Sequence, residues 1–154
     1  ELLVIKGHQD KLSTPLKAEL KKRGYHLPSQ KKSQPPTMTT AQVKFGATDN
    51  LWIRVHYFSN GKRNIHVVLK PLLDLLNQCI YHDDKQIVLV QGYDLTSQAY
   101  EIVTTDKTPN DLLKVFQTYN FSQTQPEAIL IIEIDRLPIK PSSFKVEWQP
   151  LEGF

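Results

Sequence analysis

The sequence predicts a single α/β (α+β) domain, with a mixed β-sheet of four to five strands packed against two to three helices. Its 154 residues are enough for one domain with a hydrophobic core and too few for two. Strand-like apolar runs alternate with segments of helical periodicity, which is typical of this fold class. No apolar run approaches the roughly 18 residues that span a bilayer, so we expect no membrane partner.

The N-terminal part of the chain predicts a strand and a short basic helix. Residues 2–5 are apolar and suit a first strand. Thr14 and Pro15 resemble a helix start, with Thr14 as the N-cap and Pro15 at the first helical position. Cationic residues 21–23 suit the last turn of this helix, and Gly24 suits its C-terminal cap.

Two further strands are predicted on either side of the middle of the chain. Residues 51–58 alternate in the manner of a strand with one mostly apolar face. Residues 86–95 form a nearly continuous apolar run, so we expect a strand that is covered on both faces. The alternating positions of the first strand are Leu51, Ile53, Val55 and Tyr57 against Trp52, Arg54, His56 and Phe58.

The C-terminal part contains the strongest strand signal, at residues 128–134. Residues 97–127 form an insert with one short amphipathic helix, and residues 144–148 suit a short edge strand within a C-terminal tail, 139–154. The whole chain, 1–154, is therefore expected to be one domain.

The positive charge lies at the N-terminal end. Residues 1–48 hold nine Lys or Arg and three acids, while the whole chain has a net charge of only +3. A basic region of this kind suits an anionic partner such as nucleic acid, although a solvated lysine surface explains it as well. Residues 28–40 are expected to form a mobile basic loop. The candidate DNA-binding residues are Lys17, Lys21, Lys22, Arg23, Lys31 and Lys32.

The middle of the chain predicts an amphipathic helix within residues 65–80. Its polar arc contains His66, Lys70, Asp74 and Asn77. Because Pro71 lacks a backbone N–H, the helix either starts near Val67 or is kinked.

Asp83 and Asp84 follow this helix directly. Two adjacent carboxylates suit Mg²⁺ or Mn²⁺, although an Asp-Asp pair is also common in turns. The single cysteine, Cys79, lies among apolar residues and is expected to be a small core residue in a reducing compartment.

These residues resemble a family motif. The segment from Arg63 through Lys70-Pro71-Leu72-Leu73-Asp74 to Ile80-Tyr81-His82-Asp83-Asp84-Lys85-Gln86-Ile87 is similar to the RusA family of Holliday-junction resolvases. That family has an Arg-Asp-x-Asp-Asn-x-x-Lys-Pro-x-x-Asp segment followed by hydrophobic-x-Asp-Asp-x-x-hydrophobic. The resemblance covers about 25 residues closely.

The resemblance assigns roles to individual residues. It makes Lys70 the essential lysine and Asp84, beside Asp83, the metal-binding carboxylate. It makes Asp74 and Arg63 supporting residues. Where the family has two metal-binding aspartates, this chain has Asn64 and His66, and Val67 replaces the asparagine that follows them.

The resemblance implies a small cytoplasmic homodimer, encoded by a bacterium or a phage, that cuts four-way DNA junctions with Mg²⁺ or Mn²⁺. One alternative is a branched-DNA-binding protein that no longer cleaves, because an amide and an imidazole are poorer ligands than two carboxylates for a hard cation. Another is a protein-interaction module on the same scaffold. The nuclease hypothesis requires Asn64 and His66 to converge with Asp83 and Asp84, with Lys70 between them.

Overall fold

A computed structural model describes residues 1–27, 43–61, 63–96, 100–118 and 127–148 of the chain. The 28–40 segment, with Lys31 and Lys32, lies outside the described residues. The elements are β1 (Leu2–His8), α1 (Ser13–Lys22), β2 (Leu51–Ser59), α2 (Ile65–Leu76), the 3₁₀ turn η1 (Asp84–Gln86), β3 (Ile87–Thr96), β4 (Tyr100–Thr104), α3 (Asn110–Thr118), β5 (Glu127–Arg136) and β6 (Phe144–Trp148).

The described strands form two sheets. The larger one has the strand order β1-β5-β2-β3, in which β2 pairs in parallel with β3 and antiparallel with β5. The smaller one pairs β4 with β6. The predicted fold class is confirmed: the molecule is a single small mixed α+β domain. The second sheet arises because the 97–127 insert contributes β4 as well as the expected short helix, α3.

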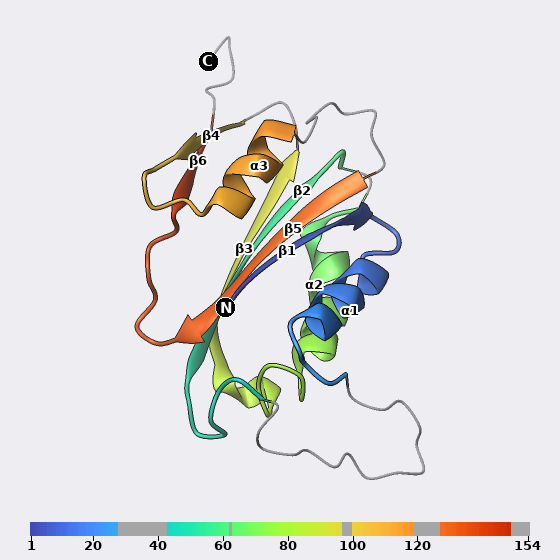
Figure 1. Cartoon of the computed structure of the whole chain (residues 1–154), viewed down its shortest axis with the longest axis vertical. Coiled ribbons are helices and arrows are strands. Elements are labelled where there is room, and N and C mark those ends of the chain that lie inside the picture. The colour runs from blue at the N-terminus through green and yellow to red at the C-terminus, as the bar shows by residue number, and fades with distance from the viewer. Residues whose placement is uncertain (28–42, 62, 97–99, 119–126, 149–154) are drawn as a thin grey trace.

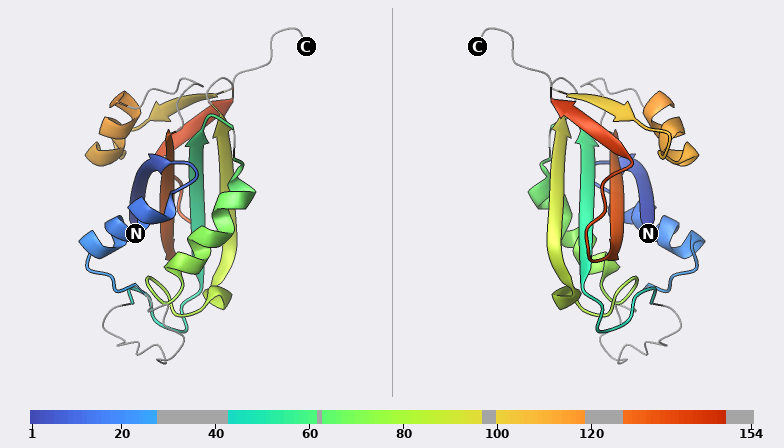
Figure 2. Two further views of the ribbon diagram at one scale, coloured as in Figure 1. Left: turned by 90° about the vertical axis from the view of Figure 1, so that its right-hand side faces the viewer. Right: turned by 90° about the vertical axis from the view of Figure 1, so that its left-hand side faces the viewer.

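The two faces of the larger sheet carry different layers (Figures 1 and 2). Helices α1 and α2 cover one face, and the β4–β6 sheet with α3 covers part of the other. Apolar residues at alternate positions of β2 and β5 point into both layers, which gives two hydrophobic clusters. No helix among the described residues is long and apolar enough to cross a membrane.

The two central strands are buried from both sides. All nine positions of β2 are buried, and most of β5 is too, which agrees with the strong strand signal at 128–134. The expectation that both faces of the strand at residues 86–95 are covered was wrong, because Val88 is 53% and Val90 43% exposed on one face of β3. β3 is also the last strand of the larger sheet in the described order. An apolar run shows that a segment prefers a strand, but it does not show that both of its faces are covered.

Helix α1 begins earlier than expected and ends as expected. Its N-cap is Leu12, which offers no side-chain hydrogen bond, so Thr14 is inside the helix and is not its cap. At the other end the N–H of Tyr25 donates to the carbonyl of Leu20, and the N–H of Gly24 donates to that of Lys21. This is a Schellman motif. Gly24 has a φ of +87°, a conformation that glycine adopts without steric cost.

We expect Gly24→Ala to lower the free energy of unfolding by about 1 kcal/mol, because alanine is strained at this positive φ. A Cβ at Gly24 meets no atom within 4 Å, so the backbone conformation is the only source of the cost. Gly24→Asn is the matched control, since asparagine tolerates the left-handed region better. Urea denaturation measures both variants, and equal losses would contradict the assignment.

Candidate functional site

Asn64 and His66, which precede Lys70 in the motif, lie at the N-terminus of α2. Asn64 is the N-cap of this helix, and its side chain accepts a hydrogen bond from the N–H of Val67 at 3.3 Å. His66 is exposed in the first turn. The helix starts at Ile65 with Pro71 inside it, so His66 belongs to the helix and not to the preceding loop.

Lys70 and Asp74 are exposed on α2. The side chain of Lys70 forms no hydrogen bond or ion pair with any other residue that the structure describes, and Asp74, one turn away, is not its partner. The lysine is therefore a solvent-facing cation in the middle of the helix.

The twin aspartates lie beyond the other end of α2. Asp83 caps the turn η1, because its Oδ1 accepts the N–H of Lys85 at 3.0 Å. Asp84 Oδ1 lies 3.1 Å from the hydroxyl of Tyr81, which also lies 3.0 Å from the carbonyl of Leu73. Burial, and then the charge of Asp84, raises the pKa of Tyr81, so the phenol stays protonated and can donate.

The two halves of the family's metal site do not meet within one chain. Helix α2 has 12 residues and is therefore about 18 Å long, with Asn64 at one end and the aspartates past the other. The parallel register pairs Leu51 with Ile87 and Ser59 with Thr96, which places these ends at opposite ends of the sheet. The expected convergence was wrong for a single chain.

The described residues contain no group of three or more His, Cys, Asp or Glu side chains that could hold a metal ion. Within one chain, Asn64 and His66 thus do not form a metal site together with Asp83 and Asp84, and no catalytic step through a metal follows from this arrangement.

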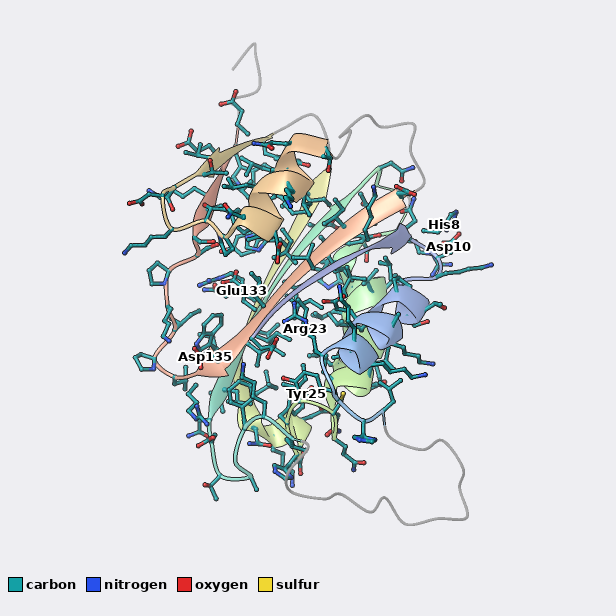
Figure 3. The ribbon with its side chains drawn as sticks, viewed as in Figure 1. His8, Asp10, Arg23, Tyr25, Glu133 and Asp135 are labelled. Carbon is teal, nitrogen blue, oxygen red and sulfur yellow. The ribbon has the colours of Figure 1, made fainter. Side chains whose placement is uncertain are left out.

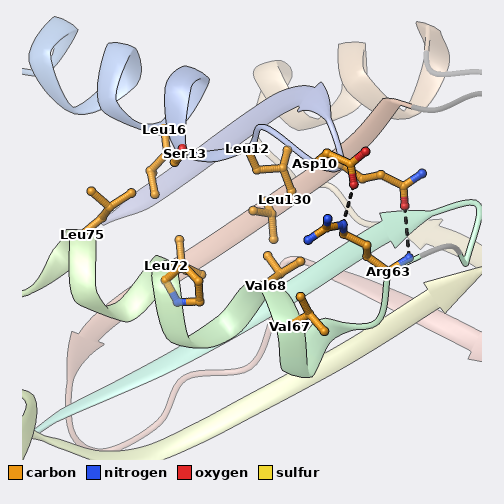
Figure 4. A pocket seen from close by; sticks show the side chains of 12 residues that line it. Asp10, Leu12, Ser13, Leu16, Arg63, Val67, Val68, Leu72, Leu75 and Leu130 are labelled. Atoms are coloured by element: carbon orange, nitrogen blue, oxygen red, sulfur yellow. Dashed lines mark hydrogen bonds and ion pairs between the residues drawn. The ribbon is translucent and has the colours of Figure 1, made fainter.

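Arg63 faces away from the aspartates as well. Its guanidinium forms an ion pair with Asp10, and its backbone N–H donates to the side chain of Gln9 at 3.3 Å (Figure 4). This pair lies at one end of a small groove of about 130 Å³ between α1 and α2. Apart from Ser13, the rest of the groove is apolar. Its apolar lining includes Leu12, Leu16, Val68, Leu72 and Leu75.

The candidate DNA-binding residues of α1 fall into two groups. Lys21 and Lys22 are exposed, Lys17 is half-exposed, and none of the three forms an ion pair with a described residue. Arg23, which is labelled in Figure 3, differs because it pairs with Glu1 and Glu19. Burial opposes ionisation of Glu1, but hydrogen bonds from Lys44 and Tyr25 lower the pKa of its carboxyl to about 2, so a charged carboxylate lies beside Arg23. The Arg23 charge is therefore compensated within the fold.

A second group of polar residues lies on the other face of the sheet and was missed as a candidate site. Arg54 of β2 is only 6% exposed. Its Nε donates to Gln91 at 3.0 Å, its Nη2 donates to the carbonyl of Lys140 at 2.6 Å, and its Nη1 lies 3.5 Å from a carboxylate oxygen of Glu133. Burial outweighs the guanidinium charge and raises the pKa of Glu133.

His56, two residues along β2, is 3% exposed. Its ring stacks on Tyr93 with 4.5 Å between centroids and an interplanar angle of 5°, and Phe144 lies against it at 4.7 Å. Nδ1 of His56 has no hydrogen-bond partner among the described residues. Burial, helped by the charge of Arg54, lowers the pKa of His56 to about 4, so the imidazole is neutral at pH 7.

The sequence did contain a signal for this site. Arg54 and His56 occupy alternate positions of a strand, between Trp52 and Phe58 on the same face. Flanking aromatics of this size indicate a covered face, and buried polar side chains must then find partners. The alternation was interpreted as a strand with one mostly apolar face, whereas both faces are covered.

Scans against family models, curated proteins and solved structures each returned no match. The likeness to the RusA family therefore rests on the motif residues in and around α2.

We expect the free energy of unfolding to fall as the pH drops from about 6.5 to about 4, because the unfolded chain protonates His56 before the folded chain does. The difference between the ordinary pKa of 6.5 and the value of about 4 corresponds to a loss on the order of 3 kcal/mol. His56→Phe keeps a stacked ring but removes the titration.

Urea denaturation of parent and variant at several pH values isolates this contribution as their difference. That difference should change across this pH range, and a constant difference would contradict a buried, neutral His56.

Proposed function

We propose that this chain binds branched DNA, four-way junctions in particular, through the layer formed by α1 and α2. The observation that carries the proposal is the set of exposed lysines in this layer that no described acid neutralises. Lys21 and Lys22 lie in the last turn of α1, and Lys70 lies on α2. Phosphate contacts from such lysines supply affinity without requiring a particular sequence.

The choice of branched DNA rests on the RusA-like motif. Lys70, Asp74 and the Asp83–Asp84 pair keep the spacing of that family. Neither Lys70 nor Asp74 is buried, so burial in the core does not account for them. A cytoplasmic location, in a bacterium or a phage-infected cell, is part of the same proposal.

Binding without cleavage is the form of this function that the single chain supports best. The amide of Asn64 and the imidazole of His66 are separated from the twin carboxylates by the length of α2. The isolated Asp83–Asp84 pair is a weak site for Mg²⁺ or Mn²⁺, because Asp83 already caps η1 and Asp84 already accepts from Tyr81.

We expect the double substitution Lys21→Gln and Lys22→Gln to weaken binding to a synthetic four-way junction and to flatten its salt dependence. Log K falls as log salt rises, and each lost phosphate contact reduces the magnitude of this negative slope by about 0.9. The loss of two contacts therefore reduces it by about 1.8. Gel-shift titrations over a range of salt concentrations measure both effects.

The matched control is Lys107→Gln with Lys114→Gln, which removes two exposed lysines from the other face of the sheet, one before α3 and one on it. The control should keep the parent slope. Equal effects of the two double variants would show that binding follows net charge and not this layer. No junction binding at low salt would reject the function.

A second candidate function, junction cleavage by a homodimer, is favoured by the free edge of β3. This strand has ten residues, pairs with β2 alone among the described strands, and exposes Val88 and Val90. Figure 2 shows it at the border of the sheet. A long apolar edge of this kind is suited to pairing with another strand.

Antiparallel pairing of β3 with β3 of a second copy changes the geometry of the motif. It sets the start of β3 in one copy, next to Asp83 and Asp84, beside the end of β3 in the other. That end lies at the N-terminus of α2, because Asp94 of β3 accepts the N–H of Ile65 at 3.1 Å. Asn64 and His66 flank Ile65. The two halves that one chain separates therefore approach each other across such a dimer.

We expect Asn64→Asp with His66→Asp to yield Mg²⁺-dependent cleavage of a four-way junction, if copies pair in this way. Aspartate caps a helix about as well as asparagine, and an acid in the first turn is favourable, so the variant should fold. Adding Val88→Lys should abolish both the dimer and the cleavage, because lysine blunts an exposed edge.

Sedimentation and a junction-cleavage assay give the two measurements. Val103→Lys, at an exposed position of β4, is the matched control and should change neither. Cleavage by a monomeric Val88→Lys protein would exclude the shared site. A folded, dimeric double-aspartate variant without cleavage would count against the RusA ancestry.

A further inference from the structure

A groove of about 310 Å³ opens on the face of the larger sheet that α1 and α2 do not cover. Its volume is at the lower end of the range of ligand pockets, roughly 300–1,000 Å³. Arg54 and His56 of β2 line it together with Tyr93 of β3, and Ser142, Phe144 and Lys145 line it from the segment that leads into β6 and from β6 itself. Polar, aromatic and cationic groups thus meet in one concave site, which also includes the acidic side chain of Glu147.

The aromatic side chains present flat surfaces. Tyr93 is parallel to the His56 ring, and Phe144 is tilted against the same ring. Tyr93 is only partly buried, so its ring is accessible from the groove. Aromatic rings of this kind stack on planar heterocycles.

The polar side chains retain hydrogen-bonding capacity. Arg54 has five N–H donors, of which the described residues use three. The guanidinium is held in place from one side by Trp52, 4.9 Å from its ring centroid. Nδ1 of His56 also lacks a partner among the described residues. These groups are fixed and largely desolvated, which strengthens their interaction with a ligand.

A buried ion pair is by itself weak evidence for a stabilising role. Replacing a buried ion pair such as Arg54–Glu133 by apolar residues of similar size is often neutral or stabilising. A buried arginine and histidine that retain free hydrogen-bonding groups beside a groove are better explained by a ligand than by packing.

We propose that this groove binds a planar nitrogen heterocycle that carries a phosphate, with guanine preferred. The base stacks on Tyr93, and Arg54 donates N–H bonds to the acceptor edge of the base. Arginine is the side chain that most often contacts O6 and N7 of guanine. Lys145 is exposed at the rim and meets the phosphate. The heterocycle comes either from a free nucleotide or from an unpaired base of a nucleic-acid strand. The site lies on the face opposite to α1 and does not depend on the junction proposal.

The test is a titration of the whole chain with guanosine 5′-monophosphate, guanosine, ribose 5-phosphate and a short mixed-sequence single strand that contains one guanine. Calorimetry gives affinities, and NMR shift changes locate the contacts. We expect the nucleotide to bind more tightly than the nucleoside, with shift changes at Tyr93 and Phe144, and ribose 5-phosphate not to bind. Tighter binding of the strand identifies a nucleic-acid source, and equal or weaker binding identifies a free nucleotide.

Two variants with matched controls test the assignment. Tyr93→Leu should weaken nucleotide binding at least about tenfold, whereas Tyr100→Leu, on β4 and outside the groove lining, should not. Lys145→Gln should remove the advantage of the nucleotide over the nucleoside, whereas Lys114→Gln should keep it.

Lys145 is exposed, so its substitution tests the site even if Tyr93→Leu fails to fold. No binding at millimolar nucleotide, shift changes confined to other surfaces, or an unchanged nucleotide advantage in Lys145→Gln would overturn the proposal. Junction binding by the parent in any of these cases would leave the function proposed for the α1 and α2 layer intact.

Discussion

The parallel pairing of β2 with β3 is the constraint on which the arrangement of this molecule depends. Adjacent parallel strands need a crossover connection, and α2 provides it by running back along the sheet. The residues just before α2 and just after it must then lie at opposite ends of the sheet. Hydrogen bonds fix both ends: Asn64 and Asp94 hold the start of the helix, and Tyr81 contacts the carbonyl of Leu73 near its end. A motif that is continuous in sequence is therefore divided in space.

The burial of β2 on both faces has a second consequence. Leu51, Ile53, Val55 and Tyr57 pack towards α1 and α2, so the intervening side chains lie beneath the smaller sheet and its flanking segments. Arg54 and His56 are thereby desolvated, and their hydrogen bonds and ring contacts come from β3, β5 and the segment around β6. The same double coverage that stabilises the centre of the sheet also removes its polar side chains from water.

Local sequence patterns predicted the helices and strands well, but they did not predict which other segments pack beside each of them. The strands at 51–58 and 128–134 and the helix over 65–76 follow from periodicity and turn residues that lie within each segment. The edge position of β3, the division of the motif by α2 and the cover over Arg54 depend on contacts between distant segments, and a single sequence does not record such contacts. The polar arc was predicted correctly for His66, Lys70 and Asp74, whereas Asn77 is the C-cap that follows α2. The distance of this arc from Asp83 and Asp84 follows only from the direction of the crossover.

Structural roles also separate the motif residues into two kinds. Asn64 and Asp83 each cap a helical element, and Asp84 accepts a hydrogen bond from the hydroxyl of Tyr81. Each of these three residues therefore has a structural role that does not require catalysis. His66 and Lys70 are exposed, and neither side chain forms a hydrogen bond with another described residue. No side-chain contact within the described fold explains an imidazole and a lysine at these two positions. The exposed side chains of His66 and Lys70, together with the lysines of α1, are therefore better evidence for a function of the α1 and α2 layer than Asp83 and Asp84 are.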